Sequence, residues 1–381
     1  MARGGLAGLL LPPLLAFAVS RLVLSTAALA AGVSPAQPGS WCRFDCGHYT
    51  TIAVRGYEIA PCPAGSRDEG ALCGNTAWLP GYPLLVRALH TLGIRPRRAA
   101  VLVSAAFALL SLALIWAALA GPWAGGEEPR DRAALALCIA AVFPGTVYLH
   151  AISPLAVYGV AALLALIFAS RGRPLAAGLA GAAAAFTYPP GFLLAPVLGT
   201  GFLLEAGALA VRARRAALSA GVAAAGFFAV TLVQYVDTGR WWAFGLIQSH
   251  YNYSLRSPLR TLGARIAPLF LPPFEGASEA PSAQTLLVAL LVGGTVGGAL
   301  LAGRLRLGVR ERFVALYAVV VWLLPLVIGE EEGGLHRREA ALLPLVLLTA
   351  RLPAPVLAAF AAAASVVAWL LALLFFRGQI V

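Results

Sequence analysis

From Trp41 to Tyr57 the chain reads Trp-Cys-Arg-Phe-Asp-Cys-Gly-His-Tyr-Thr-Thr-Ile-Ala-Val-Arg-Gly-Tyr, directly after its first long apolar segment. This stretch gathers an acid, a histidine, two arginines and several aromatic rings, whereas the sequence around it is strongly apolar. Polar and ionisable groups are costly to hold in a membrane, so they mark functional sites by default. The stretch therefore predicts a functional site beside a set of membrane helices.

The composition of the chain predicts an all-α polytopic membrane protein. Hydrophobic residues make up 60% of the 381 residues and charged residues only 12%, against about 25% charged in soluble proteins. The net charge of +12 comes from arginines in short loops between apolar segments, where they orient helices and contact anionic headgroups. We therefore expect membrane lipids as partners, no nucleic acid, and a single integral-membrane domain over residues 1–381.

Hydropathy predicts about eleven membrane spans. The first is expected to be retained, because it is longer than a secretory signal and Arg21 interrupts it. The proline-punctuated stretch 78–94 is expected to lie at the membrane interface instead of crossing it. The expected spans are 7–31, 99–120, 133–150, 154–170, 175–188, 191–211, 216–235, 284–303, 313–329, 340–351 and 354–376.

The arginine clusters predict the orientation of these spans. The clusters at 130–132, 171–173, 212–215 and 304–312 fall on one side, which the positive-inside rule makes cytoplasmic. The N-terminus is then cytoplasmic and the C-terminus external. Two long external loops follow, at about 32–98 and 236–283. Arg95, Arg97 and Arg98 break the rule, since they fall outside.

Four of the five cysteines lie in the first external loop. They are Cys42, Cys46, Cys62 and Cys73, and cysteines in an oxidising compartment favour disulfides. Cys62 with Cys73 is the favoured pair, closing a small lobe rich in proline and glycine. Three pairings remain open, as do free thiols.

Asp45 is the candidate catalytic residue. If residues 45–55 are helical, Asp45 and His48 share a face three residues apart, beside an apolar side formed by Tyr49, Ile52 and Ala53. Such a helix would lie at the interface and offer an acid to a cavity. The alternative is that Asp45 only caps the helix, since aspartate is favoured at that position.

Two motifs resemble the PIG-V-like mannosyltransferases, which are GPI mannosyltransferase II and its prokaryotic relatives in the GT-C superfamily. The family reads Trp-Asp-x-x-His/Tyr-Tyr-x-x-Ile-Ala-x-x-Gly-Tyr and then Phe-Pro-x-Tyr-Pro-Leu-Leu-x-Arg. Here the first motif is Phe44-Asp45-Cys-Gly-His48-Tyr49-Thr-Thr-Ile52-Ala53-Val-Arg-Gly56-Tyr57. The second is Leu79-Pro80-Gly-Tyr82-Pro83-Leu84-Leu85-Val-Arg87. The order of a long first loop, an interfacial helix and a compact bundle is similar along the whole chain.

The resemblance implies a fold and an activity. The fold would be a GT-C type bundle of about eleven transmembrane helices with interfacial helices in the first external loop. The chain would be an inverting glycosyltransferase moving a sugar, expected to be mannose, from a polyprenyl-phosphate carrier to a lipid or glycan acceptor outside the cytoplasm. Asp45 would be its general base, cations would hold the phosphate, and the setting would be a bacterial plasma membrane.

Further candidate contacts with substrate follow from the motifs and the later polar loops. Arginines of the loop containing His336 could bind the donor phosphate, with lipid headgroup contact as the alternative. The aromatic stretch near Gln248 suits sugar, and it equally suits an interfacial aromatic belt. The candidate substrate-binding residues are Arg43, His48, Tyr49, Tyr82, Gln248, His250, Arg337 and Arg338.

The sequence departs from the family at two places and leaves other functions open. Pro154 replaces a glutamate, and Tyr188 replaces an arginine, which puts the acceptor in doubt; the turn at Tyr188 could also be purely structural. No cofactor is required, although Asp237 or Glu330–Glu332 could join Asp45 at a divalent metal. A transporter or flippase of lipid-linked sugar and a non-catalytic scaffold are the alternative functions.

Overall fold

The computed structural model describes residues 6–65, 70–121, 123, 129–249, 254–274, 276–297, 308–329 and 335–380. Over these ranges the chain is all-α apart from two short β-strand pairs. Five of the described helices are long and apolar enough to cross a membrane, which indicates a multi-pass membrane protein. They are α1 (Leu6–Ala30), α4 (Pro96–Leu119), α10 (Leu209–Thr238), α13 (Glu279–Val292, extended by the π-helical turn η4, Gly293–Gly297) and α18 (Ala354–Arg377).

Shorter elements complete the described chain. In the first loop these are η1 (Pro38–Trp41), α2 (Cys46–Arg55), β1 (Ile59–Pro61), β2 (Leu72–Gly74) and α3 (Gly81–Thr91). The middle holds α5 (Arg130–Ala141), α6 (Thr146–His150), α7 (Leu155–Ser170), α8 (Pro174–Thr187), η2 (Pro189–Leu193), α9 (Leu194–Leu203) and α11 (Ala243–Gln248). The remainder holds β3 (Ser254–Leu255), α12 (Pro258–Ile266), η3 (Ala267–Leu269), α15 (Val309–Val327), β4 (Ile328–Gly329), α16 (Leu335–Glu339), η5 (Ala340–Leu345) and α17 (Val346–Thr349).

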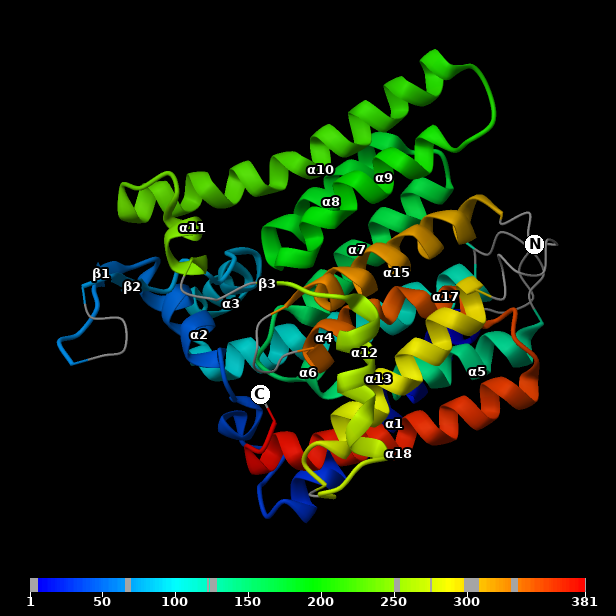
Figure 1. Cartoon of the computed structure of the whole chain (residues 1–381), viewed down its shortest axis with the longest axis horizontal. Coiled ribbons are helices and arrows are strands. Elements are labelled where there is room, and N and C mark those ends of the chain that lie inside the picture. Colours follow the sequence, from blue (N-terminus) through cyan, green and yellow to red (C-terminus); the bar gives the residue numbers. More distant parts are fainter. Residues whose placement is uncertain are drawn as a thin grey trace.

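The helices pack into one bundle around α7 and α4. The long helix α10 packs on α8 and α9 along one side, and α1 packs on α18 along the other. Between them α7 contacts α4, α8 and α15 (Figure 1). Helix α7 is apolar and buried on nearly its whole surface, which is the pattern expected of a helix at the centre of a bundle.

Several predicted spans are shorter than expected. The span predicted at 133–150 is divided into α5 and α6, because Pro144 and Gly145, with φ +84°, interrupt the helix. The span predicted at 340–351 is a 3-10 segment around Pro344 and a single α-turn. Helix α7 agrees with the predicted span 154–170 to within one residue, but its 16 residues extend only about 24 Å, less than the roughly 30 Å of a hydrocarbon core.

The first loop folds over one end of the bundle. The predicted helix at 45–55 is α2, and the predicted interfacial helix is α3. Strands β1 and β2 form an antiparallel pair that the disulfide Cys62–Cys73, the pair favoured from the sequence, crosslinks. A second disulfide joins Cys42 to Cys46 at the start of α2. Both disulfides therefore crosslink parts of the first loop to each other.

Candidate functional site

A cavity of about 470 Å³ lies at the end of the bundle that carries α2. Its lining is mixed. Polar residues come mainly from the first loop, α6, the α8–η2 turn and α16, and apolar residues come from the same loop and from η2, α11 and α15. The polar lining is Arg43, Asp45, Tyr49, Tyr148, Ser153, Thr187, Tyr188, Gln248, Arg337 and Arg338, and the apolar lining includes Phe192, Leu193, Phe244, Val321, Leu324, Pro325 and Ile328.

Asp45 is the one carboxylate among the described residues that line this cavity. It stands just before α2, yet its side chain makes no capping hydrogen bond to the helix. Its Oδ2 instead accepts a hydrogen bond from Nη1 of Arg337 at 2.7 Å. The alternative of a simple helix cap is therefore wrong in this structure, and the carboxylate faces the cavity.

The backbone before Asp45 adopts an uncommon conformation. Phe44 has φ +53°, the one described non-glycine residue with a positive φ. Such a left-handed residue costs of order 1–3 kcal/mol and persists only where its surroundings enforce it. This residue lies in the turn between η1 and α2, and Asp45 directly follows it.

Arg337 and Arg338 reach the same cavity from α16. Burial lowers the pKa of Arg337, but the Asp45 carboxylate, together with Tyr188 and Tyr148, outweighs that effect, so the pKa of Arg337 is raised. The guanidinium also lies 5.9 Å from the centroid of the Phe44 ring. Two cations and one acid therefore meet in a partly buried pocket.

The short helix α16 is held in place by a buried glutamate. Glu339 is 1% exposed, and its Oε2 accepts hydrogen bonds from Gln284 at 3.0 Å and Thr285 at 3.3 Å on α13. Gln284 also donates to the carbonyl of His336 at 2.6 Å. Burial raises the pKa of Glu339 from 4.5 to about 8, so this carboxyl is mostly neutral at pH 7. Gln284, Thr285 and Glu339 are not among the residues predicted from the sequence, although a glutamine in an apolar helix is a detectable signal.

Tyrosines complete the polar lining of the cavity. Burial raises the pKa of Tyr49 and of Tyr148 well above the usual range, so both phenols stay protonated near neutral pH. Neither phenol can therefore act as a base near neutral pH, although both can donate hydrogen bonds. Tyr188 also lines the cavity and packs edge-on against Tyr158.

Other predicted residues take structural positions. Arg43 lines the cavity, but its guanidinium donates to the carbonyls of Phe375 at 3.3 Å and Phe376 at 2.8 Å, in the last turn of α18. Tyr82 is fully buried and bonds the Ala100 carbonyl and the Ser104 hydroxyl. Tyr82 does not line the cavity, whereas Arg43 lines it and also binds the end of α18, so a binding role for Arg43 stays a prediction.

Gln248 lines the cavity, and His48 contacts a residue that lines it. The His48 ring stacks on Trp78 with centroids 3.5 Å apart, and Trp78, not His48, lines the cavity. Burial lowers the pKa of His48 despite the nearby Asp45. Gln248 lines the cavity as predicted, whereas His250 lies outside the described residues.

The second halves of both motifs position α2. Arg87 donates to the carbonyls of Ala53 at 2.8 Å and Ile52 at 2.7 Å, at the end of α2, where a cation also complements the helix dipole. Gly56 has φ +92°, and the next amide, of Tyr57, donates to Asp237 at 2.9 Å. The motif residues therefore fix the helix that follows Asp45.

Gly81 sets how closely α3 approaches α8. A Cβ atom at Gly81 would lie 2.3 Å from the Thr187 hydroxyl and 2.9 Å from the Thr187 Cα. Only a glycine permits this contact. The close approach places Thr187 and Tyr188 on the cavity wall, next to the first loop.

Both departures from the family pattern face the cavity. Pro154 and Tyr188 line it together with Asp45 and Arg337. The site therefore has a proline and a phenol where the resemblance leads one to expect a carboxylate and a guanidinium. Relative to that expectation the cavity has one carboxylate and one guanidinium fewer, with the same net charge, and Asp45 is its acid among the described residues.

No metal cluster accompanies Asp45 among the described residues. Asp237 is occupied by the Tyr57 amide and does not line the cavity. Glu330–Glu332 lie outside the described residues. No known family model and no curated protein matches this chain.

Proposed function

We propose that this chain is an inverting glycosyltransferase of the PIG-V-like mannosyltransferase family in the GT-C superfamily. It would move a sugar, taken to be mannose, from a polyprenyl-phosphate carrier to a lipid or glycan acceptor. The observation that carries the proposal is the pairing of one carboxylate, Asp45, with Arg337 at 2.7 Å in a cavity with a partly apolar lining. A base, a phosphate-binding cation and space for an isoprenoid chain are the parts that such a reaction needs.

In the proposed reaction Asp45 is the base, and Arg337 and Arg338 bind the phosphate. Asp45 takes the proton of the acceptor hydroxyl as that oxygen bonds to C1 of the sugar. The bond from C1 to the phosphate oxygen breaks on the opposite face, and polyprenyl phosphate leaves with the electron pair. Arg337 and Arg338 are placed to bind the phosphate by charge-assisted hydrogen bonds. The resting Asp45–Arg337 pair would then exchange for an Arg337–phosphate contact, which frees the base.

The mixed lining of the cavity supports a lipid-linked donor. Phe192, Phe244 and Leu324 line the same cavity as Arg337 and Arg338. These apolar side chains suit an isoprenoid chain because burying each CH₂ group contributes about 0.8 kcal/mol. The polar residues of the lining would contact the sugar and the phosphate.

The proposal includes an orientation in the membrane. Both disulfides lie at the end of the bundle that holds the cavity, and disulfides persist in oxidising compartments. We therefore propose that this end faces away from the cytoplasm, at a bacterial plasma membrane. The five long helices, together with the shorter ones, would make up the bundle of about eleven helices typical of the superfamily.

The test is transfer of radiolabelled mannose from polyprenyl-phosphate mannose by reconstituted protein, with membrane lipid extract as acceptor. Asp45→Asn serves as the comparison, because it keeps the shape of the side chain and removes the base. We expect label in a new product with the wild type and a loss of about 10²–10⁴-fold in the variant, with donor binding retained. Equal transfer by both proteins would exclude Asp45 as the base. Donor binding without turnover by either would favour a non-catalytic scaffold, and donor crossing the bilayer unchanged would favour a flippase.

A further inference from the structure

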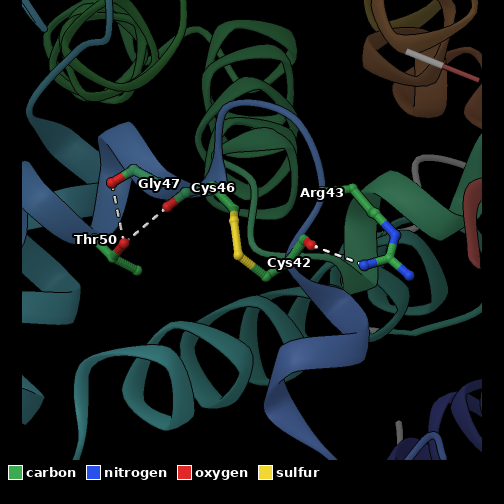
Figure 2. The surroundings of a disulfide bond; sticks show 5 residues. All are labelled: Cys42, Arg43, Cys46, Gly47 and Thr50. Atoms are coloured by element: carbon green, nitrogen blue, oxygen red, sulfur yellow. Dashed lines mark hydrogen bonds between the residues drawn. A yellow bond between two sulfur atoms is a disulfide. The ribbon is translucent and has the colours of Figure 1, made fainter. Parts of the chain in front are cut away.

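The disulfide Cys42–Cys46 encloses the candidate base. Its two half-cystines are four positions apart, and all three enclosed residues, Arg43, Phe44 and Asp45, line the cavity. Figure 2 shows the crosslink at the junction between the Arg43 segment and the first turn of α2. The crosslink therefore closes a small ring of backbone from which the Asp45 side chain emerges.

The chain on the Cys42 side of this ring is fixed to the bundle. The Trp41 carbonyl accepts a hydrogen bond from the Ile152 amide at 3.0 Å, and the Trp41 ring packs edge-on against Phe376. Arg43 holds two carbonyls at the end of α18 and also donates to the Cys42 carbonyl at 3.3 Å (Figure 2). Cys42 thus follows a segment with little freedom to move.

The chain on the Cys46 side is the start of α2. Cys46 is 4% exposed, and its carbonyl accepts a hydrogen bond from the Thr50 hydroxyl at 3.0 Å (Figure 2). The Cys46 amide donates to the Arg43 carbonyl at 3.2 Å across the ring. The disulfide therefore connects the fixed segment before Asp45 to the helix after it.

Between Cys42 and Cys46 the backbone adopts a conformation that is unfavourable for a residue other than glycine. Phe44 has φ +53°, and the Asp45 side chain forgoes the helix cap that it could make. An unconstrained turn would gain by relaxing Phe44 to a negative φ and by turning the Asp45 carboxylate onto first-turn amides of α2 as a helix cap. Either change would move the carboxylate away from Arg337.

We propose that the Cys42–Cys46 disulfide is a positioning element that holds Asp45 toward the cavity and Arg337. This inference rests on the proposed function for its kinetic consequence, but the geometry of the Asp45 turn can be measured without turnover. Cys42 and Cys46 act through the backbone and touch no reacting atom, so they are positioning residues and not catalytic ones.

The second disulfide provides a matched control. Cys62–Cys73 crosslinks β1 and β2 in the same loop, and no residue of either strand lines the cavity. The control is Cys62→Ser with Cys73→Ser, and the test variant is Cys42→Ser with Cys46→Ser. Both variants lose one crosslink of the same loop, but only the second releases the Asp45 turn.

The experiment measures kcat, donor KM and amide hydrogen exchange of the peptide 42–55 for the wild type and both variants, with and without dithiothreitol. The dithiol reduces each disulfide to two thiols and is itself oxidised to a cyclic disulfide. We expect the Cys42/Cys46 variant to lose at least tenfold in kcat with donor KM within threefold of the wild type. Its exchange at residues 43–50 should be faster, and dithiothreitol should change it no further.

The control variant should keep kcat within threefold of the wild type and respond to dithiothreitol as the wild type does. Since its remaining described disulfide is Cys42–Cys46, it tests the proposal even if the Cys42/Cys46 variant does not fold. Unchanged kcat and unchanged exchange after reduction of the folded control would overturn the proposal. If the wild type transfers no sugar, the proposed function fails, and the exchange data alone decide whether this disulfide holds the Asp45 turn.

Discussion

The two ends of the helix bundle both carry arginines beside acids, but they use these pairs differently. At the end with the first loop, Arg337 and Asp45 line a cavity, with side-chain exposures of 28% and 34%. At the opposite end, Arg215 pairs with Glu205 at 3.0 Å and Arg351 pairs with Glu311. None of these four residues lines the cavity.

Arginines of the opposite end bind the ends of helices. Arg310 donates to the Ala118 carbonyl at 2.7 Å, in the last turn of α4, and Arg312 donates to the Leu204 carbonyl, just after α9. Cations at helix C-termini satisfy unpaired carbonyls and complement the helix dipole. These arginines therefore stabilise the fold, whereas the Arg337–Asp45 pair lines a cavity that a ligand can fill. The difference teaches that placement, not the presence of a charge pair, separates the candidate site from structural ion pairs.

After substitution of Asp45, substitution of Arg337 should cause the largest loss of kcat/KM. Arg337→Gln removes the cation that faces both Asp45 and the proposed phosphate. A hydrogen bond to a charged group contributes about 1.5–3 kcal/mol, so kcat/KM should fall roughly 10–100-fold, mainly through donor KM. Steady-state kinetics on the reconstituted protein measure this loss. Arg337→Lys should recover part of it, because the charge returns without the planar fork. An unchanged donor KM in Arg337→Gln would place the phosphate elsewhere.

Substitution of Glu339 should change how the stability of the native state depends on pH, an effect of intermediate size. The Glu339 pKa of about 8, against 4.5 ordinarily, means that the unfolded chain loses this proton first as pH rises. The stability of the native state should therefore fall between about pH 4.5 and 8, by roughly 1.4 kcal/mol for each unit of pH at most. Glu339→Gln should remove this part of the pH dependence and melt at least as high as the wild type at pH 8. Thermal unfolding in detergent at pH 5 and pH 8 compares the two proteins, and an identical pH dependence would contradict the buried neutral carboxyl.

Arg351 should give the smallest effect on activity. Arg351→Ala leaves Glu311, whose side chain is 8% exposed, without its arginine, although the Gly308 amide still donates to it. Leaving a buried group partly unsatisfied costs about 1–3 kcal/mol, so the melting temperature should drop by several degrees. Transfer activity per folded molecule should stay within threefold of the wild type. A tenfold loss of activity without a change in melting temperature would remove the distinction between the two ends.

The helices of the first loop could be predicted well from the sequence. Helix α2 begins one residue after the predicted boundary, since its apolar face and polar flank follow one period. Helix α3 lies inside the predicted interfacial stretch. The predicted spans failed where Pro144 and Pro344 break helices inside apolar runs, because hydropathy averages over such breaks.

The candidate site could be predicted only in part. Asp45 and Arg337 are 292 positions apart, and the sequence placed both outside the membrane without bringing them together. Arg43 has the charge and position of a substrate-binding residue, but the carbonyls that it binds belong to α18, which no local pattern reveals. Contacts between distant segments depend on how the bundle closes, and a single sequence carries no direct signal for them.

The most direct measurement compares the matched acid-to-amide changes at the two ends, Asp45→Asn and Glu311→Gln, by the rate of sugar transfer per folded molecule at saturating donor. The account predicts a loss of about 10²–10⁴-fold for Asp45→Asn and less than threefold for Glu311→Gln, while both variants bind donor. Near-normal transfer by Asp45→Asn, or an equal loss in both variants, would contradict the claim that Asp45 is the catalytic base and that the opposite end is structural.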